Sequence, residues 1–235
     1  MSEYPLVLSE EGTIEKMLTG EYRGMARFGD GDFNVIRGQE DRYHKACPKL
    51  SRTLSSVLVG PSEGVLNCLI PPPPMKEGTL AYQRWVTYLE VNAGILPFLT
   101  DEFYGSANIS RMDSSPRLHT TFYWDLVAAL WQDKDICLIR GSERSLTEKK
   151  LLESPGAPRS VREVICKPRD NFSQFDEILE QVMGTRRGTV VLCAGLTSRP
   201  LVHALVPRGL EAYDIGHLAM YFDKGQPIPL QDCPR

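Results

Sequence analysis

The chain has 235 residues, of which 42% are hydrophobic, so it is long enough to bury a sizeable core. Its 27 basic and 30 acidic residues give a net charge of −3. That balance does not favour non-specific nucleic-acid binding, which depends on clustered lysine and arginine. The sequence lacks both the roughly 18-residue apolar run of a membrane span and the basic, then apolar, start of a secretory signal. We therefore expect a cytoplasmic protein with no membrane span.

The six cysteines are scattered through the chain without the close spacing of a zinc site. Cys137, Cys166 and Cys193 fall in runs that predict buried strands, where a free cysteine behaves as a small apolar residue. This pattern predicts reduced thiols, as in a reducing compartment.

The first third of the chain predicts helices at about 13–18 and 46–58, and strands at about 24–28 and 65–70. Four prolines at 71–74 end the second strand, and such runs favour an extended, rigid connector.

The middle of the chain predicts a helix at 78–91, with Leu80, Trp85, Tyr88 and Leu89 near one face. A short strand is expected at 106–110. Ser115-Pro116 is a typical helix start, and the helix that follows is expected to bury Leu118, Phe122, Leu126 and Leu130. The three tryptophans are expected to be core residues rather than sugar-stacking surfaces.

From residue 135 the chain alternates between apolar runs typical of buried strands and the apolar spacing typical of helices. Strands are predicted at 135–140, 161–166, 189–194 and 210–214, with helices at about 146–152, 171–183 and 198–206 between them. Such alternation is typical of βαβ units. We predict a single α/β domain over 1–235, a Rossmann-like, mostly parallel sheet with helices on both faces. The segment at about 71–117 is a candidate excursion from this domain.

Two carboxylates stand out after the first predicted strand, in Gly29-Asp30-Gly31-Asp32. Asp30 and Asp32 supply the hard oxygen ligands that Mg²⁺ or Mn²⁺ prefers. We expect both in an exposed turn, and a solvated Asp-Gly turn without a metal is the alternative.

Polar residues also follow the other predicted strands, where ligands of open α/β sheets bind. Gly195, Thr197 and Ser198 can present backbone N–H groups and two hydroxyls to a phosphate at a helix start, although an ordinary helix cap by Thr197 or Ser198 is the alternative. Lys167, Arg169 and Asn171 are candidates for holding nucleotide or phosphate; the alternative is solvated charges with Asp170 or Asn171 capping a helix.

Two segments, Ala26-Arg27-Phe28-Gly29-Asp30-Gly31-Asp32 and Asp214-Ile215-Gly216-His217, carry a family resemblance. Shorter segments that also resemble the family lie between them, in the order in which the family has them, at 109–111, 130–136, 139–144 and 171–172. From about residue 25 to 217 the chain resembles the glycosyltransferases of the GT-D fold. The resemblance implies an α/β fold of GT-D type and transfer of a sugar from a nucleoside diphosphate, with UDP expected, to a hydroxyl acceptor. The excursion at about 71–117 is then a candidate for building the acceptor side.

The resemblance also implies site residues. Asp30, Asp32 and His217 are the expected ligands of Mn²⁺ or Mg²⁺, and a packing role is the alternative for His217. The expected donor-binding residues lie in the four loops: Arg27, Gly29, Gly141, Ser142, Arg144, Lys167, Arg169, Asn171, Gly195, Thr197 and Ser198. Asp30 and Asp32 are also counted as catalytic, and Asp113 and Asp125 are the candidate bases if the reaction inverts the sugar.

The chain departs from the family pattern in four places. Thr147-Glu148-Lys149-Lys150 stands where the family tends to have an Asn-Asp pair, so no role is assigned to these residues. Asp32 stands where the family has Glu, Leu196 and Ser198 stand in a Gly-Pro-Thr-Ala-like segment, and apolar residues follow His217 where the family has acidic ones.

Two other functions stay open at this point: an Asp-x-Asp phosphohydrolase and a nucleotide-binding module without turnover. A glycan, a glycosylated protein, a small molecule and a modified nucleobase all remain open as acceptors, and the oligomeric state is undetermined.

Overall fold

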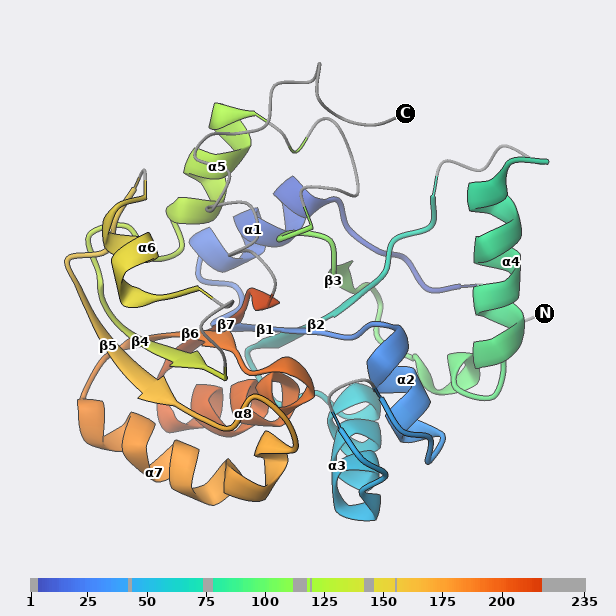
Figure 1. The fold of residues 1–235 in the computed structure, drawn as a ribbon. Coiled ribbons are helices and arrows are strands. Elements are labelled where there is room, and N and C mark those ends of the chain that lie inside the picture. The colour runs from blue at the N-terminus through green and yellow to red at the C-terminus, as the bar shows by residue number, and fades with distance from the viewer. Residues whose placement is uncertain are drawn as a thin grey trace.

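The computed structural model describes residues 4–41, 44–73, 78–111, 118, 120–141, 146–154 and 156–216. Its centre is a seven-stranded, wholly parallel sheet with the order β3-β2-β1-β7-β6-β4-β5 (Figure 1). The strands are β1 (Gly24–Arg27), β2 (Val65–Leu69), β3 (Gly105–Ser106), β4 (Asp135–Arg140), β5 (Ser160–Ile165), β6 (Thr189–Cys193) and β7 (Glu211–Asp214). The predicted α/β fold with a mostly parallel sheet is confirmed.

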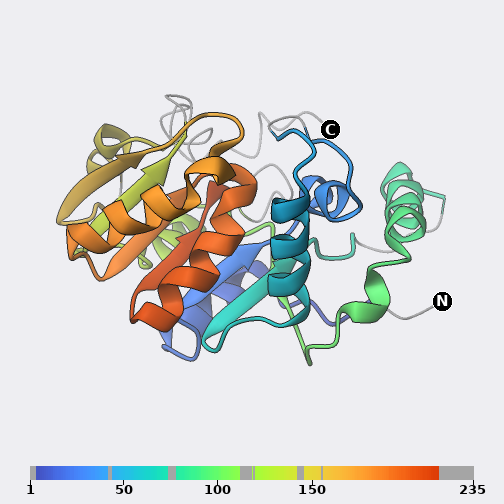
Figure 2. The same cartoon turned by 90° about the horizontal axis from the view of Figure 1, so that it is seen from below.

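Helices cover both faces of this sheet. They are α1 (Glu10–Leu18), α2 (Asp30–Ile36), α3 (Pro48–Val59), α4 (Leu80–Asn92), α5 (Thr121–Ala128), α6 (Glu148–Leu152), α7 (Phe175–Thr185) and α8 (Ser198–Leu205). Short 3₁₀ helices are η1 (Leu96–Phe98), η4 (Asn171–Gln174), η5 (Gly195–Thr197) and η6 (Val206–Arg208). In Figures 1 and 2, α1, α5 and α6 lie on one face, and α3, α7 and α8 on the other.

Two hydrophobic cores form because alternate residues of each strand face opposite sides. On β6, Val190 and Leu192 pack with α3, α7 and α8, whereas Val191 packs in the second core with α1, α5 and α6. A strand buried on both faces has no polar side, so its sequence is continuously apolar. That is why 189–194 predicts a strand so clearly.

The helices depart from their predicted bounds mainly at their amino ends. Helix α1 begins at Glu10 because Ser9 caps it, accepting a hydrogen bond from Gly12 N at 3.0 Å. Helix α5 begins at Thr121 with Thr120 as its cap, while the predicted Ser115-Pro116 start lies outside the described residues.

Phe122, which was predicted to be buried, is exposed, and so is Leu80, which was predicted to lie near one face of its helix. Phe122 is 72% exposed because α5 buries Tyr123, Val127 and Ala128 instead. Leu80 is 60% exposed, because it is the first residue of α4 and lies off the face that packs through Trp85. Trp85 and Trp131 are buried, as predicted.

The first and last strands lie side by side at the middle of the sheet. Gly24 pairs with Ala212 and Met25 with Tyr213, so β1 and β7 are neighbours. From β1 the strand order runs outward to β2 and β3, and from β7 it runs to β6, β4 and β5. The carboxyl ends of β1 and β7 therefore meet where the order changes direction, the place at which α/β sheets bind ligands.

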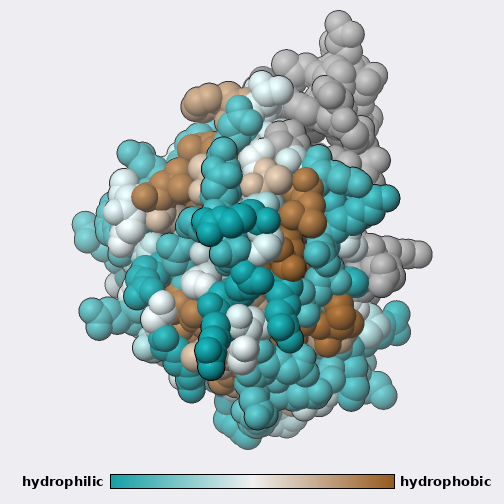
Figure 3. All heavy atoms as spheres, turned by 90° about the vertical axis from the view of Figure 1, so that its left-hand side faces the viewer, coloured by the Kyte–Doolittle hydropathy of each residue, from teal (hydrophilic) through white to brown (hydrophobic). Residues whose placement is uncertain are grey.

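The β5 edge of the sheet is protected by charge. Arg140 on β4 makes two 2.8 Å hydrogen bonds to Glu163 on β5, and Glu163 also accepts from Glu148 N at the start of α6. Figure 3 shows that the face on this side is largely hydrophilic, with separate hydrophobic patches. Charged residues at an edge strand discourage pairing with another chain.

No helix among the described residues is long and apolar enough to cross a membrane. The five described cysteines are free thiols, four of them buried. The single-domain boundary and the acceptor role of 71–117 stay predictions; the described part of that segment forms α4, η1 and β3.

Candidate functional site

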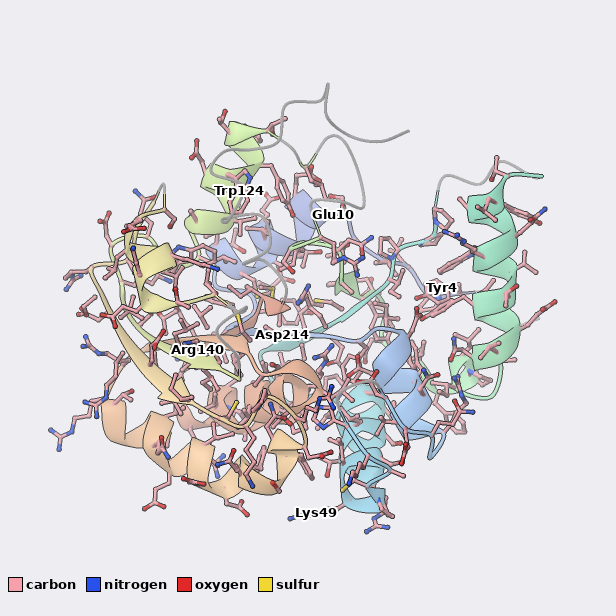
Figure 4. The ribbon with its side chains drawn as sticks, viewed as in Figure 1. Tyr4, Glu10, Lys49, Trp124, Arg140 and Asp214 are labelled. Atoms are coloured by element: carbon pink, nitrogen blue, oxygen red, sulfur yellow. The ribbon has the colours of Figure 1, made fainter. Side chains whose placement is uncertain are left out.

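Arg27, the last residue of β1, is buried and tied to two other parts of the chain. Its guanidinium donates to Ala107 O at 3.1 Å and to Ser110 Oγ, in the segment after β3. Its Nη2 lies 3.6 Å from Asp214 Oδ1, and its backbone N–H donates to Asp214 Oδ2 at 3.3 Å. Arg27 therefore joins the carboxyl ends of β1, β3 and β7, and Figure 4 shows Asp214 near the centre of the molecule.

Asp32 lies in the first turn of α2 rather than in an exposed turn, and it is only 1% exposed. The predicted exposure is wrong because the Gly-Asp-Gly-Asp segment forms the helix start itself. Asp32 Oδ2 accepts from Gly29 N at 2.8 Å, while Asp32 N donates to Gly29 O at 3.0 Å. This reciprocal cap turns the carboxylate inward. Asp30, two residues earlier at the start of α2, is exposed.

Arg199, the second residue of α8, bridges the two buried carboxylates. Its Nη2 donates to Asp32 Oδ2 at 2.9 Å, and its Nη1 lies 3.4 Å from Asp214 Oδ2. Its Nε is 2.9 Å from Asp32 Oδ1, close enough for an ion pair but not aligned for a hydrogen bond. Two carboxylates and two guanidiniums thus form one buried cluster, Arg27–Asp32–Arg199–Asp214.

Burial and charge oppose each other in this cluster. Burial raises the pKa of Asp32 to about 6, although Arg199 and the Gly29 N–H act against the rise. Burial also disfavours the charge on Arg199, but Asp32 and Asp214 outweigh it and raise the Arg199 pKa above its ordinary value. The guanidinium therefore stays charged beside Asp32.

The cluster is incompletely hydrogen-bonded. In the described part of the chain, six buried side-chain nitrogen or oxygen atoms have no hydrogen-bond partner, and four of them are here: Arg27 Nε, Asp32 Oδ1, Arg199 Nε and Asp214 Oδ1. Buried polar atoms are normally satisfied, so a concentration of exceptions calls for an explanation. A bound ligand that supplies the missing partners is the simplest one.

Gly216 closes the site beneath Arg27. Its φ of 46° lies in the left-handed region that favours glycine, and a Cβ there would overlap Arg27 Nη2. A side chain at this position would displace the guanidinium from Asp214. The glycine of the Asp-Ile-Gly-His motif thus leaves the space that the Arg27 guanidinium occupies, although the two residues are 189 positions apart.

The loop after β6 uses its hydroxyls internally. Thr197 Oγ1 donates to Asn171 Oδ1 at 2.5 Å, and Asn171 Nδ2 donates to Ala194 O at 3.0 Å. Ser198 Oγ accepts from Ala194 N at 3.1 Å. The Thr197 hydroxyl therefore donates inside the protein, and both hydroxyls are buried, so the expected hydroxyl contacts with phosphate are not supported.

The helix-cap alternatives for these loops also fail. Neither Thr197 nor Ser198 caps α8 with its side chain. Asp170 does not cap η4 but accepts from Lys45 N at 2.9 Å. Asn171 is buried and joins the loops after β5 and β6. These polar residues hold the loops together at the carboxyl edge.

The remaining predicted residues fall into three groups. Gly141 follows β4, where a Cβ would come within 2.9 Å of Lys167 O, so it allows the next loop to approach closely. Lys167 and Arg169 are exposed, and so is Asp125 on α5, which has no hydrogen bond or ion pair to the cluster in the described structure. Asp113, Ser142, Arg144 and His217 lie outside the described residues.

The sequence interpretation missed Arg199. A cation in the first turn of a helix opposes the helix dipole, and this signal could have pointed to an anionic partner for Arg199. His44 is buried, as a packing residue is, and its Nε2 would lie 3.7 Å from a Cβ on Gly195. Burial lowers the pKa of His44, against the opposing effect of Asp41 and Asp170. Nothing in its local sequence indicates this place.

An aromatic cluster holds α4 beside α2. Trp85 and Tyr88 stack with ring centroids 5.1 Å apart, Tyr4 meets Trp85 edge-on at 4.8 Å, and Phe33 of α2 meets Tyr88 at 6.0 Å. Figure 4 shows Tyr4 next to α4. These rings bury one another, so they fix the position of the helix that flanks Asp30.

Comparison with known proteins gives a consistent result. The family model for the glycosyltransferase GT-D fold matches residues 25–224. The chain is 30% identical over 220 residues to a probable glycosyl transferase, Gly, of Streptococcus gordonii, and 22% identical over 235 residues to the glycosyltransferase GlyD of Streptococcus pneumoniae. The matches cover 90% and 93% of this chain but only 32% and 28% of those relatives, so it spans about a third of their length.

Solved structures agree with the fold. One is a new glycosyltransferase (DUF1792) from Streptococcus sanguinis, with 26% identity and a TM-score of 0.78 over 95% of this chain and 86% of that one. Another is the highly conserved domain of unknown function 1792, described as having a distinct glycosyltransferase fold. It has 25% identity and a TM-score of 0.80 over 95% of this chain and 83% of that one.

Proposed function

The chain belongs to the GT-D fold family of glycosyltransferases, and we propose that it transfers a sugar from a UDP-sugar to a hydroxyl acceptor in a metal-dependent reaction. The observation that carries this proposal is the set of four buried atoms without a hydrogen bond in the Arg27–Asp32–Arg199–Asp214 cluster. They lie at the carboxyl ends of β1 and β7 and at the start of α8, where the strand order changes direction.

The residues present fit a divalent cation. Asp32 Oδ1 and Asp214 Oδ1 are buried carboxylate oxygens without a hydrogen bond, whereas Asp30, two residues before Asp32 in the first turn of α2, is exposed. Side chains two residues apart on a helix do not face each other, so the fit rests on Asp32 and Asp214. Among the described residues no group of three or more His, Cys, Asp and Glu side chains is arranged to hold a metal, and the remaining predicted ligand, His217, is not among them. We therefore propose Asp32 and Asp214 as ligands, with Asp30 and His217, the other ligands that the resemblance implies, completing the set. When bound, the cation would neutralise charge on the departing diphosphate.

The chain's own groups supply the rest of the chemistry. Arg27 and Arg199 place two guanidiniums at the site, and guanidinium binds phosphate in a planar, two-pronged geometry. The backbone N–H groups of the Gly195 loop, ahead of α8, add dipoles of the same sign. In the reaction the bond from the anomeric carbon to the diphosphate oxygen breaks, a bond to the acceptor oxygen forms, and the acceptor hydroxyl gives its proton to a base, for which Asp113 and Asp125 are the candidates if the reaction inverts the sugar. The positive groups favour the charge that develops on the diphosphate.

The test is release of UDP from UDP-sugars in the presence of Mn²⁺, with Asp32→Asn as the site variant and Asp176→Asn, an exposed residue of α7, as the matched control. We expect UDP release by wild type and by Asp176→Asn, and a loss of about 100-fold in Asp32→Asn, the scale seen when a group that stabilises developing charge is removed.

The products separate the competing functions. Release of inorganic phosphate instead of UDP would identify a phosphohydrolase. Tight UDP binding without turnover of any UDP-sugar, with or without an added acceptor, would identify a binding module.

A further inference from the structure

Arg199 holds a position that a metal on the same carboxylates would need. Its Nε is 2.9 Å from Asp32 Oδ1, and its Nη1 is 3.4 Å from Asp214 Oδ2. The two acids come from different elements, α2 and β7, so the guanidinium is the cation that bridges them. With Arg27 on the other side of Asp214, the cluster contains two positive and two negative charges.

The bridge is geometrically imperfect. Arg199 Nε, Asp32 Oδ1 and Asp214 Oδ1 are all buried without a hydrogen bond. A buried ion pair offsets its desolvation cost only when the remaining donors and acceptors are satisfied. The site of Arg199 in the first turn of α8 also opposes the helix dipole. These features indicate that a cation which binds the two carboxylates more tightly can displace the Arg199 guanidinium.

A divalent cation and Arg199 cannot both contact Asp32 Oδ1. Two positive charges at one carboxylate oxygen repel each other strongly in a buried site. A displaced guanidinium would remain tethered at the start of α8, where its Nη1 already donates to Gly195 O. That loop precedes the N-terminus of α8, and a helix N-terminus is suited to an anion.

We propose that Arg199 competes internally with the divalent cation for Asp32 and Asp214, and that the cation, by displacing it, makes it available to the diphosphate of the donor. The inference rests on the proposed function. It assigns to Arg199 a positioning role that links the two ligands. The cation alone binds weakly, because Arg199 must first leave the carboxylates. The nucleotide strengthens cation binding, because its diphosphate binds the displaced guanidinium.

Cooperativity follows from this competition. The state that can bind the cation is the one in which Arg199 has left the carboxylates. If that state is only partly populated, the apparent affinity for the cation is reduced, and a second ligand that stabilises the state restores it. UDP and Mn²⁺ should therefore each raise the affinity for the other by the same factor. Without Arg199 the competition for the metal disappears, and so does the part of the coupling that it carries.

The experiment is calorimetric titration with MnCl₂ alone, UDP alone, and each in the presence of the other. Wild type is compared with Arg199→Gln, Arg199→Lys and the control Arg208→Gln, an exposed arginine beyond the end of α8. We expect Arg199→Gln to bind Mn²⁺ alone about tenfold more tightly than wild type, and to lose most of the mutual enhancement between Mn²⁺ and UDP. Arg208→Gln should behave as wild type.

Arg199→Lys keeps the charge, so it is the variant to use if Arg199→Gln does not fold. A single ammonium cannot bridge both carboxylates as the guanidinium does, and Mn²⁺ affinity should lie between those of wild type and Arg199→Gln. Mn²⁺ affinity that is unchanged or weaker in the Arg199 variants would overturn the inference.

The failure of this inference differs from a failure of the proposed function. If wild type binds Mn²⁺ and UDP cooperatively and releases UDP from a UDP-sugar, but the Arg199 variants do the same, only the inference fails. If wild type binds neither ligand, both fail.

Discussion

Single residues in this chain derive their roles from partners that lie far away in the sequence. His203 on α8 is 6% exposed and accepts from Ser62 N through Nδ1 at 3.1 Å. Its Nε2 is 3.0 Å from Asn67 Oδ1, so Nε2 carries the proton and donates. The neutral ring is satisfied on both sides and ties α8 to the middle of β2 and to the segment before it. Burial lowers the pKa of His203 to about 4.

This shift predicts how stability depends on pH. The folded pKa lies below the unfolded value of about 6.5, so between these values the unfolded chain binds more protons and stability falls as pH falls. Between pH 7 and pH 5 the free energy of unfolding should lose about 2 kcal/mol through His203. Urea unfolding at both pH values, in wild type and in His203→Gln, isolates this contribution.

The variant removes the titrating ring, so its own loss between pH 7 and pH 5 should be smaller than that of wild type by this amount. Equal pH dependence in the two proteins would show that His203 is protonated in the fold. Comparing the pair cancels other groups, including Asp32, whose raised pKa acts in the opposite direction.

At the scale of elements, side chains join loops that the chain separates. Thr197 and Asn171 connect the loop after β6 with the loop after β5, and Ser198 turns back to Ala194. These bonds fix the start of α8, from which Arg199 reaches the site. The hydroxyls that resemble ligand-binding groups in the sequence are thus structural in the fold.

Thr197→Val tests this assignment. Valine has the shape of threonine but no hydroxyl, so Asn171 Oδ1 loses its buried donor, and the free energy of unfolding should fall by about 1–3 kcal/mol. Thr197→Ser, which keeps the hydroxyl, should lose less. Urea unfolding measures both changes.

UDP affinity, measured with Mn²⁺ well below the unfolding temperature, supplies the second readout. It should be nearly unchanged in Thr197→Val if the hydroxyl has only its internal partner. A large loss of UDP affinity in a variant as stable as wild type would restore the phosphate contact that the sequence suggested.

At the scale of the whole molecule, the site depends on the order of the strands. Because β1 and β7 are neighbours, groups from the two ends of the chain share one buried cluster. A ligand bound there contacts elements from both halves of the sheet, so its binding free energy acts on the folded state as a whole.

We therefore expect UDP with Mn²⁺ to raise the unfolding temperature more than either ligand alone. A ligand that binds only the folded state stabilises it by mass action, by about 2.7 kcal/mol at a hundredfold excess over Kd. Thermal unfolding with each ligand, and with both, measures the shifts. In Asp32→Asn the combined shift should fall to that of UDP alone; a full combined shift in that variant would exclude Asp32 as a metal ligand.

The periodicity of the sequence was sufficient for the architecture. The run 135–140 coincides with β4, and 189–194 exceeds β6 by one residue, because strands buried on both faces are continuously apolar. The helix after residue 111 was predicted less well. Phe122 and Leu126 are as apolar as core residues, and spacing alone does not say which side of a short helix meets the sheet.

What the sequence by itself determined about this protein was the α/β class, the parallel sheet and the carboxyl-end loops that carry its polar residues, since these follow from local periodicity and from the direction of the strands. What only the tertiary structure decided was how the charges pair. Arg199 and Asp32 are 167 positions apart, and their contact depends on β7 lying between β1 and β6. Burial then turned a carboxylate that looked solvated into half of a buried ion pair, because its surroundings, not its type, set its exposure.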